Sequence, residues 1–205
     1  MTTPREEWHG EEWHDQQNAV TNIRPQEAPM RFAYADPPYL GCGKLYAANH
    51  ADALVWDDPE THRDLIDRLC SNYPDGWALS CSTPSLSVLL PMCPTNVRIA
   101  AWVKPFAAYK RNVRVAYTWE PVIFHGGRVS SVDGAGVNRD HLAEPITLRK
   151  GLTGAKPERF CRWVLDLLGW KHGDTVVDLF SGTGIFGRVV EATEAQSALF
   201  SAGAS

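Results

Sequence analysis

Short apolar segments alternate with amphipathic ones along the chain from residue 31 onward. The apolar segments are rich in β-branched and aromatic residues and are bounded by Gly, Pro, Asp or Ser, which is typical of buried strands. The expected strands are RFAYA (31–35), GWALSCS (76–82), VRIAAWVK (97–104), TWEPVIFHG (118–126) and DTVVDLF (174–180). Because helical patterns separate several of them, the sequence predicts an α/β fold with a parallel sheet and helices on both faces.

The amphipathic segments indicate where the helices begin and end. Residues 57–70 have an acidic capping residue, Asp57 or Asp58, followed by Pro59 at the first helical position. Residues 156–170 carry a proline near their start and a glycine near their end, with apolar side chains at helical spacing between them. Two further helices are expected, a short one near residues 84–90 and a final one through residues 185–195.

The chain divides into a polar leader and one larger domain. Residues 1–29 contain six acidic and two basic side chains, so the net charge of −4 resides in this segment. We expect it to be a flexible acidic leader, because its prolines favour an extended linker. Residues 30–205 are long enough for one domain with its own core, and a glycine-rich polar insert interrupts the pattern near 126–153.

The composition excludes several classes of protein. No apolar run approaches the roughly 18–20 residues that a membrane span needs, and the polar, acidic N-terminus is unlike a signal peptide. The five cysteines are irregularly spaced and form no CxxC pair, which is typical of reduced thiols and argues against zinc. We therefore expect a cytoplasmic protein with no membrane association and no metal.

A basic window without any acidic residue lies between Asp75 and Glu120. Its cations alternate with aromatic residues, an arrangement that suits a polyanion with bases that stack. The predicted nucleic-acid contacts are Lys104, Lys110, Arg111 and Arg114 in this window and Arg128 in the insert. A solvated loop whose counter-charges lie elsewhere explains the window equally well.

The last expected strand runs directly into a glycine turn and a helix. Gly182 and Gly184 let the backbone pass close to a ligand, and the start of the helix offers free N–H groups. Together with Gly187 they match the dinucleotide fingerprint, but that fingerprint expects an acid about 20 residues further on, where Ala202 stands. An NAD-dependent oxidoreductase and a plain glycine turn remain alternatives to an S-adenosylmethionine loop, which DLFSGTG resembles more closely.

A second motif, DPPY, follows the first expected strand. Pro37 and Pro38 fix their own φ angles and restrict the residue before them, so Asp36 and Tyr39 are held in defined directions. Ligands of open α/β sheets bind at such strand ends. A carboxylate, an exposed carbonyl and an aromatic ring together favour a socket for a planar ring with an exocyclic amino group, although Asp-Pro-Pro also occurs in plain turns.

DPPY, AKPERF and DLFSGTG, in this order, resemble the amino-group DNA methyltransferases of the permuted (beta) class, over roughly residues 31–195. WVK (102–104) and WEPVIFHGG (119–127) are also similar to segments of those enzymes and of the MT-A70-type adenine methyltransferases. The resemblance implies a Rossmann-like methyltransferase domain over residues 30–205 with a circularly permuted motif order. Its two motif-bearing strand ends would lie side by side.

The resemblance also implies a mechanism. A target base is flipped out of double-stranded DNA and stacks on Tyr39. Asp36 and the carbonyl of Pro37, held by the turn at Pro38, accept hydrogen bonds from its exocyclic amino group, and the methyl group is transferred in one in-line step. No cysteine nucleophile is required, and the leading Asp favours adenine N6 over cytosine N4.

The implied cofactor is S-adenosyl-L-methionine, with contacts expected from Asp36, Lys156, Pro157, Asp178, Phe180, Ser181, Gly182, Thr183 and Gly184. Two features depart from the pattern of the family. No carboxylate follows Glu194, where family members have an acid for the cofactor ribose. Either Glu191, Glu194 or another element supplies it, or cofactor binding is weak. The insert that would read DNA is short, which suggests loose or short recognition, a homodimer or a partner subunit.

Other functions stay open at this point. Within enzymes they are cytosine-N4 transfer and methylation of RNA adenine or of a protein amide, although enzymes acting on peptide amides prefer Asn where Asp36 stands. From another class comes a catalytically silent, methyltransferase-like subunit that binds nucleic acid. The motifs do not distinguish restriction-modification, phage DNA modification or regulation as the biological setting.

Overall fold

The computed structural model describes residues 28–47, 52–106, 113–129, 137–147 and 155–202, and the expected leader lies almost entirely outside them. The strands are β1 (Arg31–Ala35), β2 (Gly76–Ser80), β3 (Arg98–Val103), β4 (Trp119–Gly126), β5 (His141–Ala143) and β6 (Thr175–Asp178). The α-helices are α1 (Pro59–Asn72), α2 (Leu86–Leu89), α3 (Glu158–Leu168) and α4 (Ile185–Ala202). Short 3-10 helices are η1 (Gly43–Leu45), η2 (Ala53–Asp57), η3 (Thr83–Ser85) and η4 (Leu90–Met92).

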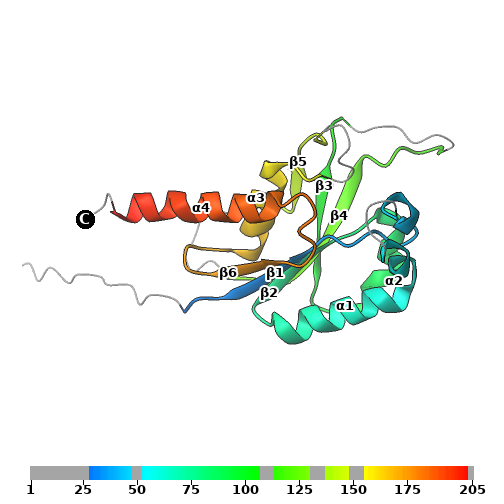
Figure 1. Cartoon of the computed structure of the whole chain (residues 1–205), viewed down its shortest axis with the longest axis horizontal. Coiled ribbons are helices and arrows are strands. Elements are labelled where there is room, and N and C mark those ends of the chain that lie inside the picture. The colour runs from blue at the N-terminus through cyan, green and yellow to red at the C-terminus, as the bar shows by residue number, and fades with distance from the viewer. Residues whose placement is uncertain (1–27, 48–51, 107–112, 130–136, 148–154, 203–205) are drawn as a thin grey trace, which may run out of the picture.

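The strands form a six-stranded sheet in the order β5-β3-β4-β2-β1-β6 (Figure 1). Strands β2, β1 and β6 are parallel, and Tyr34 of β1 pairs with both Ala78 of β2 and Asp178 of β6. The segments that follow β1 and β6 therefore leave the sheet next to each other at the same edge. DPPY and the glycine loop are those segments, so they are neighbours, as the resemblance required.

The sheet is mixed, and the prediction of a parallel sheet was wrong for one strand. Strand β4 runs antiparallel to both of its neighbours, β2 and β3. The described part of the β3–β4 connection contains no helix, and an antiparallel return needs none, whereas parallel neighbours are usually joined through a crossover helix. The insert also contains β5, which pairs in parallel with β3 and extends the sheet.

Helices cover both faces of the sheet, and alternation along β1 assigns its side chains to the two resulting layers. Phe32 and Tyr34 lie in the layer under α3 and α4, whereas Ala33 and Ala35 lie in the layer under α1 and α2. The first layer contains seven buried aromatic residues, namely Phe32, Tyr34, Trp102, Phe124, Phe160, Trp163 and Phe186. The second is mainly aliphatic around Trp77.

The predicted helix boundaries are confirmed where local chemistry sets them. The side chain of Asp58 caps α1 by accepting the backbone N–H of Glu60 at 3.0 Å, and Pro59 is the first helical residue. Gly169 ends α3 with a φ of 64°, in the left-handed region that glycine enters without strain. All five cysteines are free thiols. No helix within the described residues is long and apolar enough to cross a membrane.

Candidate active site

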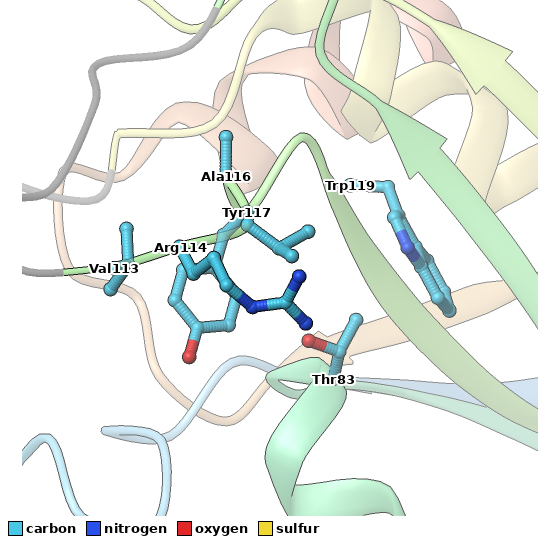
Figure 2. Close-up of a pocket in the computed structure, with 7 residues that line it drawn as sticks. Thr83, Val113, Arg114, Ala116, Tyr117 and Trp119 are labelled. Carbon is cyan, nitrogen blue, oxygen red and sulfur yellow. The ribbon is translucent and has the colours of Figure 1, made fainter.

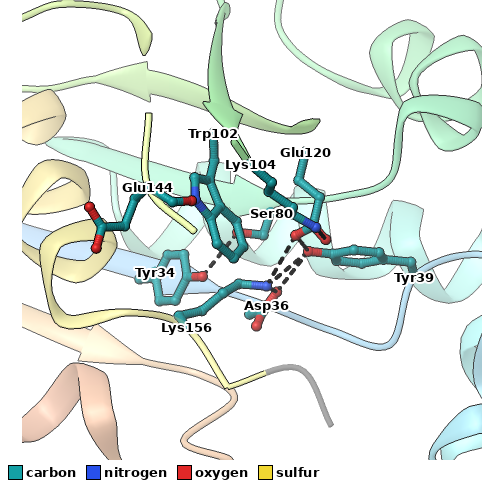
Figure 3. A network of polar contacts seen from close by, with 9 residues as sticks. All are labelled: Tyr34, Asp36, Tyr39, Ser80, Trp102, Lys104, Glu120, Glu144 and Lys156. Atoms are coloured by element: carbon teal, nitrogen blue, oxygen red, sulfur yellow. Dashed lines mark hydrogen bonds and ion pairs between the residues drawn. The ribbon is translucent and has the colours of Figure 1, made fainter. Parts of the chain in front are cut away.

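Five polar side chains meet at the carboxyl edge of the sheet, beyond the end of β1 (Figure 3). Asp36 and Tyr39 belong to the DPPY segment. Glu120 is near the start of β4, which begins at this edge because the strand is antiparallel, while Lys104 follows β3 and Lys156 precedes α3. These five residues are called the carboxylate–lysine cluster below.

Lys156 is central to the carboxylate–lysine cluster, and only 9% of its side chain is exposed. Its ammonium nitrogen lies 2.9 Å from Asp36 Oδ1, donates to the hydroxyl of Tyr39 at 2.9 Å and lies 3.5 Å from Glu120 Oε2. The ring centroids of Tyr39 and Trp102 are 5.3 and 5.6 Å away from it. Carboxylates and ring faces both attract N–H donors and cations, so this site is suited to hold an amino group.

Tyr39 is held by its hydroxyl as well as by the prolines before it. The hydroxyl is 2.8 Å from Glu120 Oε2 and 3.3 Å from Asp36 Oδ1, and Lys104 binds the other carboxylate oxygen of Glu120. Sequence reasoning did not assign a role to Glu120. An acidic residue near the start of a largely apolar strand, at the end of the acid-free window, was the signal available.

Burial and ion pairing have opposite effects on the pKa values of the residues in the carboxylate–lysine cluster. Burial raises the pKa of Asp36, and the nearby ammonium of Lys156 only partly offsets this. Burial also acts to raise the pKa of Glu120, but Lys156 and Lys104 overcome it and hold that pKa below its usual value. For Lys156, burial favours the neutral amine, yet Asp36 and Glu120 outweigh it and raise the pKa. Lys156 is therefore protonated at neutral pH.

The lowered pKa of Glu120 predicts a specific dependence of stability on pH. A carboxylate with a folded-state pKa below its unfolded value stabilises the fold above the unfolded pKa, about 4.3 for Glu, and this contribution is lost as pH falls through the folded pKa. In urea unfolding, the stability difference between the wild type and Glu120→Gln should therefore shrink from neutral pH down to pH about 3. A difference that stays constant over this range would show that the ion pairs of Glu120 do not set its pKa.

The glycine loop lies beside the cluster, at the end of β6. Gly182 and Gly184 have φ values of 42° and 68°, which allow the tight turn into α4. Asp178, half-buried at the end of β6, accepts the backbone N–H of Phe180 at 3.2 Å. Burial raises the pKa of Asp178, although that hydrogen bond acts against it. The ring of Phe180 packs against Trp56 of η2, with centroids 5.0 Å apart, so the chain after DPPY covers part of this loop.

The residues predicted to bind the cofactor fall into two neighbouring groups. Asp178, Phe180 and the residues from 181 to 184 form the loop after β6. Lys156 lies in the carboxylate–lysine cluster, and the buried Pro157 is the N-cap of α3. Within this loop, the carbonyl oxygen of Ser181 accepts the backbone N–H of Gly184, and the carbonyl oxygen of Thr183 accepts a hydrogen bond from the guanidinium of Arg188.

The predicted nucleic-acid contacts are more scattered. Lys104 is 11% exposed and paired with Glu120, so its side chain belongs to the carboxylate–lysine cluster instead of the surface. Arg128 lies at the opposite edge of the sheet, where it pairs with Asp174 at 2.6 Å and is 10% exposed. We therefore remove Arg128 from the proposed nucleic-acid surface. Arg114 lines a surface pocket, whereas Lys110 and Arg111 lie outside the described residues.

Glu194 was one candidate for the acid that binds the cofactor ribose. Its carboxylate instead binds His172 and accepts the backbone N–H of Gly173 at 3.3 Å, in the turn that precedes β6. This turn is at the edge of the sheet opposite to the glycine loop, so Glu194 cannot serve that role in this conformation. Within the described part of the chain, no group of three or more His, Cys, Asp or Glu residues is placed to hold a metal ion.

No protein-family model and no curated protein matches the chain. Among solved structures, the chain is similar to M1.HpyAVI in its complex with SAM, with 16% identity over 81% of this chain and 80% of that one and a TM-score of 0.53. It is also similar to TTHA0409 from Thermus thermophilus, assigned as a DNA modification methylase and complexed with S-adenosyl-L-methionine (14% identity, 82% and 80% covered, TM-score 0.47). The similarity to M1.HpyAVI confirms the predicted fold class, a Rossmann-like α/β sheet with helices on both faces.

Proposed function

We propose that this protein transfers the methyl group of S-adenosyl-L-methionine to the exocyclic amino group of a flipped base in DNA, with adenine N6 as the acceptor. The observation that carries the proposal is the pairing of Tyr34 with Asp178, which brings the ends of β1 and β6 together. DPPY follows one strand and the glycine loop follows the other. Their order along the chain supports the further proposal of a permuted motif order.

The loop after β6 fits a cofactor with a carboxylate and an aromatic base. The turn at Gly182 and Gly184 brings backbone N–H groups and the start of α4 to one place, where an anionic group is favoured. Asp178 supplies a partly buried carboxylate for N–H or O–H donors, and Phe180 supplies an apolar ring. When bound there, S-adenosyl-L-methionine supplies an electrophilic methyl group on a sulfonium centre.

The residues of DPPY position the acceptor. The ammonium of Lys156 lies 2.9 Å from Asp36 Oδ1 and donates to the hydroxyl of Tyr39, so it marks hydrogen-bonding positions that an amino group can use. We propose that the amino group of the base takes this place and donates to Asp36 and to the carbonyl of Pro37, while Lys156 keeps its contact with Glu120. Asp36 is the nearest group to hold the proton that the amino nitrogen releases, since burial already raises its pKa.

Binding of S-adenosyl-L-methionine, measured by isothermal titration calorimetry, tests the proposal at its first step. We expect saturable binding by the wild type and its loss in Gly182→Val, because a β-branched residue is strained at a φ of 42°. Gly187→Ala is the matched control, since it lies in α4 with open space where a Cβ would stand. No binding by the wild type would favour the silent nucleic-acid-binding subunit, and binding of NAD in its place would favour an oxidoreductase.

Tyr39 provides a second test, directed at the base. Tyr39→Ala should weaken binding of the flipped base by about 1–3 kcal/mol, the usual contribution of base–aromatic stacking, and methyl transfer should fall accordingly. Tyr39→Phe and Tyr39→Trp keep a ring and should retain much of the activity. The rates of labelled methyl transfer to DNA measure this, and equal losses in the Ala and Phe variants would mean that the hydroxyl, not the ring, carries the role.

A further inference from the structure

A surface pocket opens between the end of β2 and the segment that leads into β4 (Figure 2). Its volume of about 450 Å³ falls within the range of small-ligand sites. Its lining residues are Thr83, Arg114, Tyr117 and Trp119, together with the aliphatic Val113, Val115 and Ala116. These residues are called the Arg114 pocket below.

The lining of the Arg114 pocket combines one cation, the aromatic rings of Tyr117 and Trp119 and the hydroxyl of Thr83, and includes no acid. In Figure 2 the guanidinium of Arg114 points toward Thr83, with Trp119 beyond it. Within the described residues, Arg114 forms no ion pair. Tyr117 and Trp119 are 44% and 37% exposed. Rings that stack on bases and a guanidinium that binds phosphate or a base face are the usual components of single-stranded nucleic-acid sites.

The Arg114 pocket lies close to the proposed active site. Trp119 directly precedes Glu120, whose carboxylate binds the hydroxyl of Tyr39 at 2.8 Å. Neighbouring residues of a strand point to opposite faces, so Trp119 and Glu120 contribute to sites on either side of β4. Both sites are at the carboxyl edge of the sheet, because β4 begins there and Thr83 follows the end of β2.

We propose that the Arg114 pocket is a nucleotide subsite, which holds the base and phosphate of a nucleotide next to the target in the nucleic-acid strand. The inference rests on the proposed function, because it takes a nucleic acid as the substrate. The rings of Trp119 and Tyr117 stack on the base, Arg114 binds its phosphate, and the hydroxyl of Thr83 offers one hydrogen bond to the base edge. The pocket thereby contributes to which sequence is bound around the target.

Photo-cross-linking of the full-length protein to iodouracil-substituted duplex DNA tests the subsite without requiring activity. Mass spectrometry should find the adduct on Tyr117 or Trp119, and excess unlabelled oligonucleotide should suppress it far more strongly than a free mononucleotide. Adducts confined to other parts of the chain would overturn the proposal. Stronger suppression by the mononucleotide would also overturn it, because the pocket would then serve a free nucleotide.

Variants extend this test to affinity. Arg114→Gln and Trp119→Ala should each weaken DNA binding, measured by fluorescence anisotropy, by about tenfold, while binding of S-adenosyl-L-methionine and the urea midpoint stay at the wild-type values. Arg68→Gln, which removes an exposed cation from α1, is the charge-matched control and should bind DNA normally. Wild-type affinity in both pocket variants would overturn the subsite. If cross-links and affinity changes occur but DNA is never methylated, the subsite stands and the proposed methyl transfer fails.

Discussion

Asp36→Ala is expected to abolish detectable methyl transfer, and Asp36→Asn to lower it by about 10²–10³-fold, the usual loss when one preorganised polar contact to the transition state is removed. Asp36 is placed by Pro37 at the end of β1 and is 20% exposed. Its carboxylate is the group that would accept the amino hydrogen and then hold a proton. Asn keeps one acceptor oxygen but has no charge and cannot hold that proton.

The measurement is the initial rate of labelled methyl transfer to DNA, with calorimetric binding of S-adenosyl-L-methionine recorded for each variant. Cofactor binding should change little, because the turn at Gly182 and Gly184 and the carboxylate of Asp178 stay in place in these variants. Asp64→Asn, at an exposed position of α1, is the matched control and should transfer methyl groups at the wild-type rate. A wild-type rate in Asp36→Asn would remove Asp36 from the mechanism.

Lys156→Met is expected to cost about 3 kcal/mol of unfolding free energy, the lower end of the range for breaking a buried ion pair. The lower end applies because Asp36 and Glu120 keep about a fifth of their side-chain surface exposed. The loss arises because Asp36 is left without its cation, whereas Glu120 keeps Lys104. Urea unfolding of Lys156→Met against Lys44→Met, an exposed lysine of η1, measures it at neutral pH.

The same variant has a predicted pH dependence. Burial raises the pKa of Asp36 and Lys156 lowers it, so removing the lysine raises that pKa further. A carboxylate with a raised folded pKa destabilises the fold when ionised, and this cost disappears as pH falls and the group is protonated. The penalty of Lys156→Met should therefore be smaller at pH 5 than at pH 7.5. A penalty that grows on acidification would contradict the assigned ion pair.

Local chemistry made several features predictable from the sequence. Helix α1 begins where expected because Asp58 caps it and Pro59 is its first residue. Helix α3 ends where expected because Gly169 follows it in the left-handed conformation. Each of these signals depends only on residues nearby in the sequence. Each of the two motifs, DPPY and the glycine loop, consists of a strand end followed by a turn. Their juxtaposition followed from the resemblance, and the parallel pairing of β1 with β6 provides it.

Features that depend on distant parts of the chain were not predicted. The direction of β4 is set by pairing with β2 and β3, and strand periodicity is the same in either direction. Glu120 reaches the active-site edge only because of that direction. Arg128 looked like an exposed cation of the insert, but the buried carboxylate of Asp174 binds it at 2.6 Å. In each case, a deciding partner is distant in the sequence: β4 pairs with β2 at Leu79 and Ile123, Glu120 with Tyr39, and Arg128 with Asp174.

The position of Lys156 connects the DPPY segment with the proposed substrate. The resemblance predicts that Lys156 lies beside the cofactor, and in the structure its ammonium contacts Asp36 and Tyr39. The nitrogen of this side chain indicates where an amino group is favoured next to DPPY. Substrate entry and displacement of Lys156 are thus expected to be coupled, which links the stability of the cluster to the proposed chemistry.

In the proposed mechanism, two neighbouring strand ends hold a sulfonium methyl donor next to the amino group of a base. The most direct test incubates the protein with DNA and isotopically labelled S-adenosyl-L-methionine, digests the DNA to nucleosides and identifies the labelled product by mass spectrometry. We predict labelled N6-methyladenine, absent with Asp36→Ala. Labelled 5-methylcytosine, or no labelled nucleoside from a protein that binds both DNA and the cofactor, would contradict it.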